Sequence, residues 1–195
     1  MPAPASPIIQ PGRVLRTRDL GRWGTNPARL GKRLVREGTL ERLGHGIYTR
    51  PKTGRFGRVP PDEASVLRAF LDGSPFVITG SDRWNALGLG ATAVLAVTLA
   101  YNTKRSGRFV LGGRPYILRR VRFPLPAATE WFVVDLIEHA DMAGATRSDI
   151  ERALGAALAA RRFDAAELRE AAAEYGTRAT RALVDRAMTA ARSAA

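Results

Sequence analysis

The sequence predicts an α+β fold in three parts: an N-terminal winged helix-turn-helix over residues 1–58, a small mixed α/β domain over 59–124, and C-terminal helices over 125–195. The first part contains two short helix patterns followed at once by a Gly-containing hairpin pattern. The second part alternates strand-like runs with short helical ones, and the third is rich in alanine with helical periodicity. These three observations define the predicted class and its boundaries.

Two helices are predicted near the N-terminus. Thr17 can cap a short helix over the run RDLGRW. Thr25 or Asn26 can cap a second helix, which has Pro27 at its first position and Gly38 just beyond its end. The pattern is that of a helix, a turn and a helix.

The second of these helices is predicted to be amphipathic. Leu30, Leu34 and Val35 share one side, which predicts a face that packs on the core. The opposite face could simply be a charged, solvent-exposed surface. The hairpin that follows this helix favours instead a role of that face in binding DNA. That opposite face carries four cations at helical spacing: Arg29, Lys32, Arg33 and Arg36.

In winged-helix proteins such a helix enters the major groove, and the hairpin after it contacts the backbone or the minor groove. Arg29 and Arg33 could make bidentate contacts to guanine, whereas Lys32 and Arg36 suit phosphates. We therefore predict double-stranded DNA as a partner of this helix.

The predicted hairpin turns at Gly44-His45-Gly46, because glycine reaches positive φ without steric cost. Tyr48 is expected to pack the hairpin onto the cationic helix. A catalytic His45 is disfavoured, since only Glu41 lies at a suggestive spacing. The hairpin adds Arg42, His45 and Arg50 to the predicted DNA contacts, and the basic Gly- and Pro-rich run over 50–61 is predicted to be a linker.

The central part is predicted to begin with a helix from Asp62 to Leu71, whose apolar residues form a stripe. Gly112-Gly113 is expected to join the last two strands of this part as a hairpin turn. The other predicted elements are a buried strand over 75–81, a short helix over 82–89, and strands over 93–102, 107–113 and 114–123.

Four helices are predicted from Leu125 onward. The residues 125–195 carry nine cations against eleven acids, so they make a poor nucleic-acid surface and either complete the core or bind a protein partner. The capping and boundary signals are Thr146 with Asp149, Asp164 with Glu167, and Gly176 before Thr177.

Positive charge is concentrated toward the N-terminus of a chain whose formal net charge is +13. Residues 1–60 carry 13 Lys and Arg against three acids, and residues 61–124 carry nine against four. Arginine supplies 28 of the 31 cations, a bias that a GC-rich coding sequence would also produce. The gradient still favours a polyanion as partner of the first sixty residues, with nucleic acid preferred to a membrane surface.

Several classes of function are disfavoured. No long apolar run or secretion signal is present, so we expect a cytoplasmic protein without a membrane partner. The chain has no cysteine and two distant histidines, which argues against a metal site. The run from Gly88 to Ala93 matches a dinucleotide fingerprint without its acidic residue, and Gly80-Ser81 lacks the paired acids of a two-metal centre. We expect neither a cofactor nor an enzyme.

Two segments resemble the AbiEi-type antitoxin family. The run Leu-x-x-Glu-Gly-x-Leu-x-Arg-Leu over 34–43 and Gly46-x-Tyr48 resemble the family's N-terminal winged helix, a moderately specific match. The order Asn85-Ala-Leu-Gly-Leu89, with the segments VITGSDRWNALGLGATAV and VTLAYNTKRSGRFVLGGRPYILRR, is similar to the following domain and is more specific. The resemblance covers Gly12 to Pro124.

The resemblance implies an antitoxin of a toxin-antitoxin or abortive-infection pair that represses its own operon and counteracts a nucleotidyltransferase-type toxin. Its DNA site would be its own promoter, where we expect inverted repeats. The alternative is a stand-alone winged-helix transcriptional regulator without a toxin, and the oligomeric state stays open. The family has a full first helix, whereas residues 1–12 contain four prolines and are expected to form at most a turn. Ile8 and Ile9, later helices or a second subunit would then have to fill its place.

Overall fold

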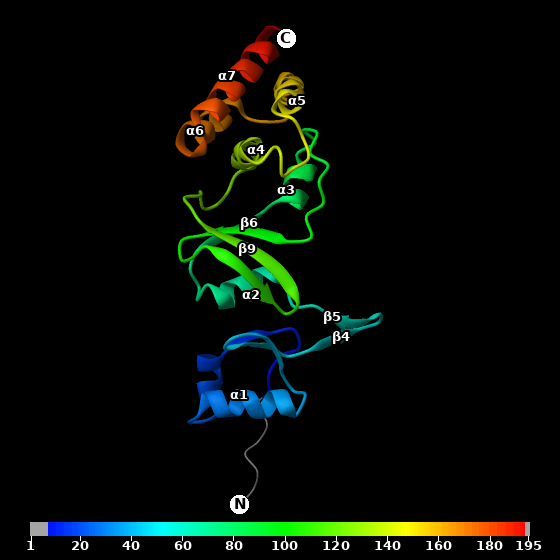
Figure 1. Ribbon diagram of the computed structural model, residues 1–195, viewed down its shortest axis with the longest axis vertical. Coiled ribbons are helices and arrows are strands. Elements are labelled where there is room, and N and C mark those ends of the chain that lie inside the picture. The colour runs from blue at the N-terminus through cyan, green and yellow to red at the C-terminus, as the bar shows by residue number, and fades with distance from the viewer. Residues whose placement is uncertain (1–7, 194–195) are drawn as a thin grey trace, which may run out of the picture. The chain divides into compact units, whose positions relative to one another are not determined.

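The computed structural model describes residues 8–193 and shows a mixture of helices and strands, as the sequence predicts (Figure 1). The strands are β1 (Val14–Arg16), β2 (Glu41–Gly44), β3 (Ile47–Thr49), β4 (Lys52–Gly54), β5 (Gly57–Val59), β6 (Phe76–Thr79), β7 (Thr98–Asn102), β8 (Gly107–Leu111) and β9 (Arg114–Arg120). The helices are the 3-10 helix η1 (Thr17–Trp23) and the α-helices α1 (Pro27–Arg36), α2 (Glu63–Phe70), α3 (Ser81–Ala86), α4 (Thr129–Glu138), α5 (Arg147–Ala159), α6 (Ala165–Tyr175) and α7 (Arg178–Ser193).

The described chain forms two compact units, each with its own hydrophobic core. The first unit comprises residues 8–76 and Arg108–Tyr116, and the second comprises Val77–Gly107 and residues 117–193. The division into domains at 58/59 and 124/125 stays a prediction, because compactness alone does not show which segments fold independently.

The first unit contains a three-stranded antiparallel sheet in the order β1-β3-β2. Its central strand β3 places Tyr48 opposite Leu15 of β1 and Arg42 of β2. The prediction that Thr17 caps the first helix is wrong. Thr17 instead donates its hydroxyl to the Gly46 carbonyl, 3.3 Å away, and the element is a 3-10 helix.

Within residues 8–193, no helix precedes η1 in this unit. Residues 8–12 contain only a turn, as predicted, while residues 1–7 lie outside the described part of the chain. Ile9 is 1% exposed, whereas Ile8 is 93% exposed, so of these two isoleucines it is Ile9 that packs into the core. The buried residues that it joins are Leu15, Leu20, Leu30, Leu34, Leu40 and Tyr48.

The segment predicted as a linker is a second antiparallel hairpin, made of β4 and β5 (Figure 1). The linker prediction is therefore wrong for residues 52–59. After this hairpin, α2 begins as predicted, with the Asp62 side chain accepting a hydrogen bond from the Ser65 backbone N–H at 2.8 Å.

A four-stranded sheet has the order β6-β7-β9-β8. The strand predicted over 93–102 begins only at Thr98, because side chains of α3 hold the preceding residues as a loop. The Asn85 amide donates to the Ala93 carbonyl at 3.0 Å, and the Leu95 backbone N–H donates to the Ser81 hydroxyl at 3.2 Å.

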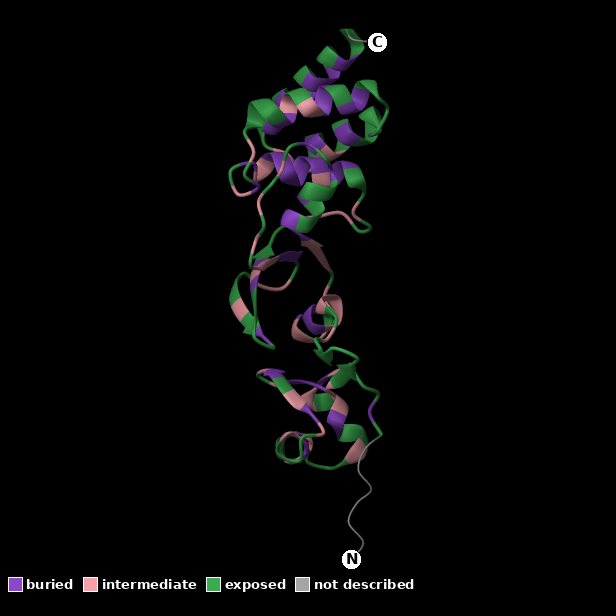
Figure 2. Cartoon of the chain, turned by 90° about the vertical axis from the view of Figure 1, so that its right-hand side faces the viewer, coloured by how far each residue is buried: buried purple, intermediate pink, exposed green. Residues whose placement is uncertain are grey.

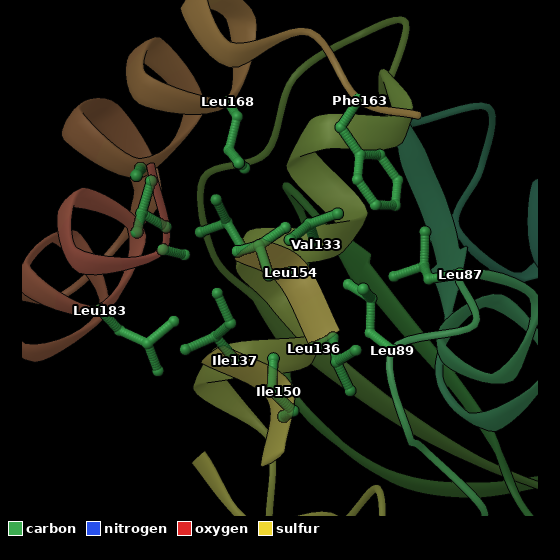
Figure 3. Close-up of a cluster of buried hydrophobic side chains, with 14 of the residues drawn as sticks. Leu87, Leu89, Val133, Leu136, Ile137, Ile150, Leu154, Phe163, Leu168 and Leu183 are labelled. Atoms are coloured by element: carbon green, nitrogen blue, oxygen red, sulfur yellow. The ribbon is translucent and has the colours of Figure 1, made fainter. Parts of the chain in front are cut away.

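The second unit contains the four C-terminal helices that the sequence predicts. Helix α4 packs against α6, and α5 packs against α7. Figure 3 shows how leucine, isoleucine and valine side chains from these helices meet around α4, together with Leu87, Leu89 and Phe163. Thr146 caps α5 and Asp164 caps α6, as predicted.

Candidate nucleic-acid interface

Local sequence signals at both ends define where helix α1 begins and ends. The Asn26 side chain accepts a hydrogen bond from the Arg29 backbone N–H at 3.0 Å, and Pro27 occupies the first helical position. Gly38 follows the helix with a φ of +72°, a conformation that favours glycine. These signals set where the helix starts and ends, and so which of its side chains are exposed.

The buried face of α1 consists of Leu30, Gly31 and Leu34. A β carbon on Gly31 would lie 3.0 Å from the Tyr48 hydroxyl and from Cζ of that ring. The missing side chain thus lets Tyr48 of β3 pack directly on the helix, as the sequence predicts. This contact couples α1 to the hairpin of β2 and β3.

Three of the four predicted cations of α1 are exposed: Arg29, Lys32 and Arg36. Arg33 is half-buried, and its Nε lies 3.6 Å from Oε1 of Glu37. An exposed i, i+4 pair of this kind contributes little to stability, but it lowers the charge that Arg33 presents. The exposed face is cationic, and the arrangement suits binding to phosphates.

The hairpin of β2 and β3 turns at His45 and Gly46, as predicted. Gly46 has a φ of +69°, and its carbonyl accepts the Thr17 backbone N–H at 2.9 Å. His45 is exposed and, within residues 8–193, makes neither a hydrogen bond nor an ion pair. Arg42 is exposed too, with its Nε donating to the Gly44 carbonyl at 3.1 Å. Nothing in this geometry activates His45 for chemistry.

Arg50 lies in a different environment from the other predicted DNA contacts. It is half-buried, and its Nη1 donates to the Ile9 carbonyl. Its backbone N–H donates to the Arg13 carbonyl at 3.1 Å, and its own carbonyl accepts from Gly12 at 2.8 Å. Arg50 thus fastens the N-terminal segment to the end of β3.

Sequence reasoning missed the β4–β5 hairpin, which is exposed along both strands (Figure 2). Its residues include Lys52, Arg55, Phe56 and Arg58. A signal was available, since glycines at 54 and 57 bracket a two-residue turn and Thr53 precedes them. This hairpin adds cations to the first unit.

A buried polar cluster in the second unit was also missed. Asp135 of α4 places a carboxylate in the interior of the second unit, where it is only 5% exposed. Oδ1 accepts a hydrogen bond from the Tyr101 hydroxyl at 2.6 Å, and Oδ2 accepts from Nε1 of Trp84 at 2.8 Å and from the Thr79 hydroxyl. His139 completes the cluster, with Nδ1 3.4 Å from Oδ1 of Asp135. The only sequence signal was the i, i+4 spacing of Asp135 and His139.

These contacts shift the ionisation of the cluster. Burial works to raise the pKa of Asp135, but hydrogen bonds from His139, Thr79 and Tyr101 outweigh it and lower that pKa. Burial likewise works to lower the pKa of His139, but its hydrogen bonds to Asp135 raise it. Burial, together with the Asp135 charge, raises the pKa of Tyr101. The cluster therefore favours a charged Asp135, and it joins β6, α3, β7 and α4.

No family model, curated protein or solved structure matches the chain. Within residues 8–193, no group of three or more His, Asp or Glu side chains is placed to hold a metal ion. Over the same residues, no helix has the length and apolar character needed to cross a membrane.

Proposed function

We propose that the protein is a DNA-binding antitoxin, which represses its own operon through a winged helix in its first unit and counteracts a nucleotidyltransferase-type toxin. The observation that carries the DNA-binding part is the exposed cationic face of α1 beside the β2–β3 hairpin. The antitoxin part rests on the resemblance over residues 12–124.

The order of elements supports a winged helix. A short strand, a helical segment, the cationic helix and a two-stranded hairpin follow one another, and β1 pairs with β3. A recognition helix followed by a wing has this order, and the helix presents its polar face to the major groove. Gly31 and Tyr48 hold the helix and the wing together, so both could approach one duplex at the same time.

The buried Asp135 cluster does not favour an enzyme. The Tyr101 and Thr79 hydroxyls both donate to the Asp135 carboxylate. Nε2 of His139 lies 3.2 Å from the Tyr101 hydroxyl and 3.2 Å from Nη1 of Arg119, so the imidazole is already engaged within the cluster. We propose that this cluster stabilises the second unit, which would serve as the toxin-directed part of the chain.

A salt titration on the promoter of the protein's own gene tests DNA binding. With about five phosphate contacts from α1 and the β2–β3 hairpin, these two elements should contribute about −4.5 to the slope of the logarithm of affinity against the logarithm of salt concentration. The measurement is fluorescence anisotropy of a labelled promoter fragment. A slope near zero would refute an electrostatic DNA interface.

The double variant Arg29→Glu/Lys32→Glu should abolish promoter binding and leave the melting temperature nearly unchanged, because both side chains are exposed. The matched control is Arg178→Glu/Arg181→Glu on α7, which has the same spacing, exposure and charge change. If both variants lose binding equally, net charge and not this face accounts for the affinity.

Co-expression with the neighbouring gene separates the antitoxin from the stand-alone regulator. An antitoxin should restore the growth of cells that express a toxic neighbour. A neighbour that is harmless on its own, together with intact promoter binding, would favour the regulator.

A further inference from the structure

The β4–β5 hairpin is a surface feature that the DNA-binding proposal does not yet use. Its strands pair Lys52 with Val59, Thr53 with Arg58 and Gly54 with Gly57. Every residue of both strands is exposed, and within the first unit the hairpin extends away from the sheet and helices (Figure 1). It therefore contributes little to the core of that unit.

Several local features restrict the conformations that the hairpin can adopt. Pro51 precedes it and Pro60 follows it, and the ring of each proline restricts the backbone at the base. Gly57 takes a φ of +107° after the turn. Nη1 of Arg58 lies 3.2 Å from Oε2 of Glu41, which ties β5 to β2. Restricting the backbone in this way reduces the conformational entropy that is lost when the hairpin binds a partner.

The tip of the hairpin combines an exposed ring with cations. Arg55 and Phe56 form the two-residue turn, and the Phe56 side chain is 97% exposed. The Arg55 guanidinium carbon lies 5.7 Å from the centre of that ring. Lys52 and Arg58 follow on the strands, and residues 50–60 include no acidic side chain. The tip of the hairpin thus exposes one aromatic ring among positively charged side chains.

We propose that this tip enters the minor groove of double-stranded DNA, where Phe56 wedges between base steps and bends the duplex. Proteins that kink DNA in this way insert apolar side chains from the minor groove and neutralise the flanking phosphates. Arg55 and Lys52 would make the phosphate contacts, because Arg58 is already paired with Glu41. The inference rests on the proposed function, in which α1 binds the same DNA.

The charge of the hairpin is the reason for choosing DNA over a protein or a lipid surface. A protein partner would have to supply acids to match Lys52 and Arg55 around a single ring, whereas a duplex presents phosphates on both sides of its minor groove. One exposed phenylalanine is also too small an apolar surface to anchor a stable protein interface.

The test compares Phe56→Ala with Phe56→Leu on a promoter fragment that carries a fluorophore at each end. Phe56→Ala should weaken binding by about tenfold, the effect of losing one aromatic stacking contact. It should also reduce the bend that energy transfer between the ends reports. Phe56→Leu should retain most of the bend, because leucine also serves as a wedge. The salt slope should stay unchanged in both variants.

The cationic contacts have a separate readout. Lys52→Ala and Arg55→Ala should each reduce the magnitude of the salt slope by about 0.9, the value for one lost phosphate contact. A circular dichroism melt should show all four variants folded, since Phe56 and its neighbours lie outside the core.

Three outcomes would overturn the inference in distinguishable ways. If Phe56→Ala binds and bends the promoter like the wild type, while Arg29→Glu/Lys32→Glu abolishes binding, the wedge is wrong and the proposed function stands. If the wild type binds no DNA, both fail. Loss of toxin neutralisation by Phe56→Ala with unchanged DNA bending would also overturn it and would make the hairpin a protein-binding surface.

Discussion

Replacing Asp135 with asparagine tests the polar cluster that joins α3, α4, β6 and β7. The carboxylate accepts hydrogen bonds from Trp84, Tyr101 and Thr79, and His139 lies beside it. Asparagine has nearly the same shape, so packing changes little. It keeps one acceptor oxygen and turns an amide N–H₂ toward groups that are themselves donors.

The expected cost follows from these lost contacts. A hydrogen bond to a charged group contributes about 1.5–3 kcal/mol, and removing one partner of a buried charged cluster costs about 3–5 kcal/mol. We therefore expect Asp135→Asn to lower the free energy of unfolding by about 3–5 kcal/mol. For a chain of this size the melting temperature should fall by about 10 °C.

The difference between wild type and variant should also depend on pH. Because the pKa of Asp135 is lowered in the folded state, its contribution is present above about pH 3.9 and is lost as the pH falls through the lowered value. The pKa of His139 is raised, so its contribution is complete below about pH 6.5 and is lost as the pH rises through the raised value. The difference should be largest between these limits.

Urea unfolding monitored by tryptophan fluorescence is a suitable assay, because Trp84 and Trp131 are both buried in the second unit. Asp141→Asn is the matched control: the same substitution at an exposed carboxyl three residues beyond α4 should change the free energy by less than about 0.5 kcal/mol. The reasoning is refuted if Asp135→Asn costs no more than this control, or if the difference is flat from pH 4 to pH 8.

Three further predictions concern the first unit. Ile9→Ala should lower the free energy of unfolding by about 2–4 kcal/mol, whereas Ile8→Ala should leave it unchanged; equal effects in urea titrations would contradict the packing. Alanine usually stabilises a helix by about 1 kcal/mol relative to glycine, but Gly31→Ala should lower the melting temperature because the new methyl group meets Tyr48. His45→Ala should weaken promoter binding by less than about tenfold and keep the fold, whereas lost function with intact DNA binding would reopen a chemical role.

Much of the first unit could be predicted because its signals are local. Asn26 and Pro27 mark the start of α1 and Gly38 lies just beyond its end, and the buried and cationic faces follow from helical spacing. The turn at His45 is defined by its neighbouring glycines in the same way.

The β4–β5 hairpin could not be predicted by its hydrophobic pattern. A period of two appears in a sequence when one face of a strand is buried, and here both faces are exposed. Prolines at 51, 60 and 61 then made the segment resemble a linker. The glycines at 54 and 57 were the remaining signal, and they are typical of loops as well as hairpins.

The Asp135 cluster was missed for a different reason. Only the i, i+4 spacing of Asp135 and His139 connects its members in the sequence. Thr79, Trp84 and Tyr101 lie on three other elements, 56, 51 and 34 residues before Asp135, so no spacing connects them to it. A lone buried aspartate in an apolar helix is visible only once tertiary packing brings its donors together.

The predicted DNA-contact residues differ in whether their side chains already interact within the fold. Arg50 holds the Ile9 carbonyl and Arg33 lies beside Glu37, so contact with a phosphate would compete with an existing interaction. Lys32 and Arg36 are exposed, and their side chains can reach a duplex without breaking a bond of the folded chain.

Alanine substitutions should therefore separate the two kinds of cation. Arg50→Ala should lower the melting temperature, because the partly buried Ile9 carbonyl loses its donor at a cost of about 1–3 kcal/mol. Lys32→Ala and Arg36→Ala should leave the melting temperature unchanged and reduce the magnitude of the salt slope by about 0.9 each. If Arg50→Ala changes the salt slope as much as Lys32→Ala does and leaves the fold as stable as the wild type, Arg50 belongs to the DNA surface and its contact with Ile9 is dispensable.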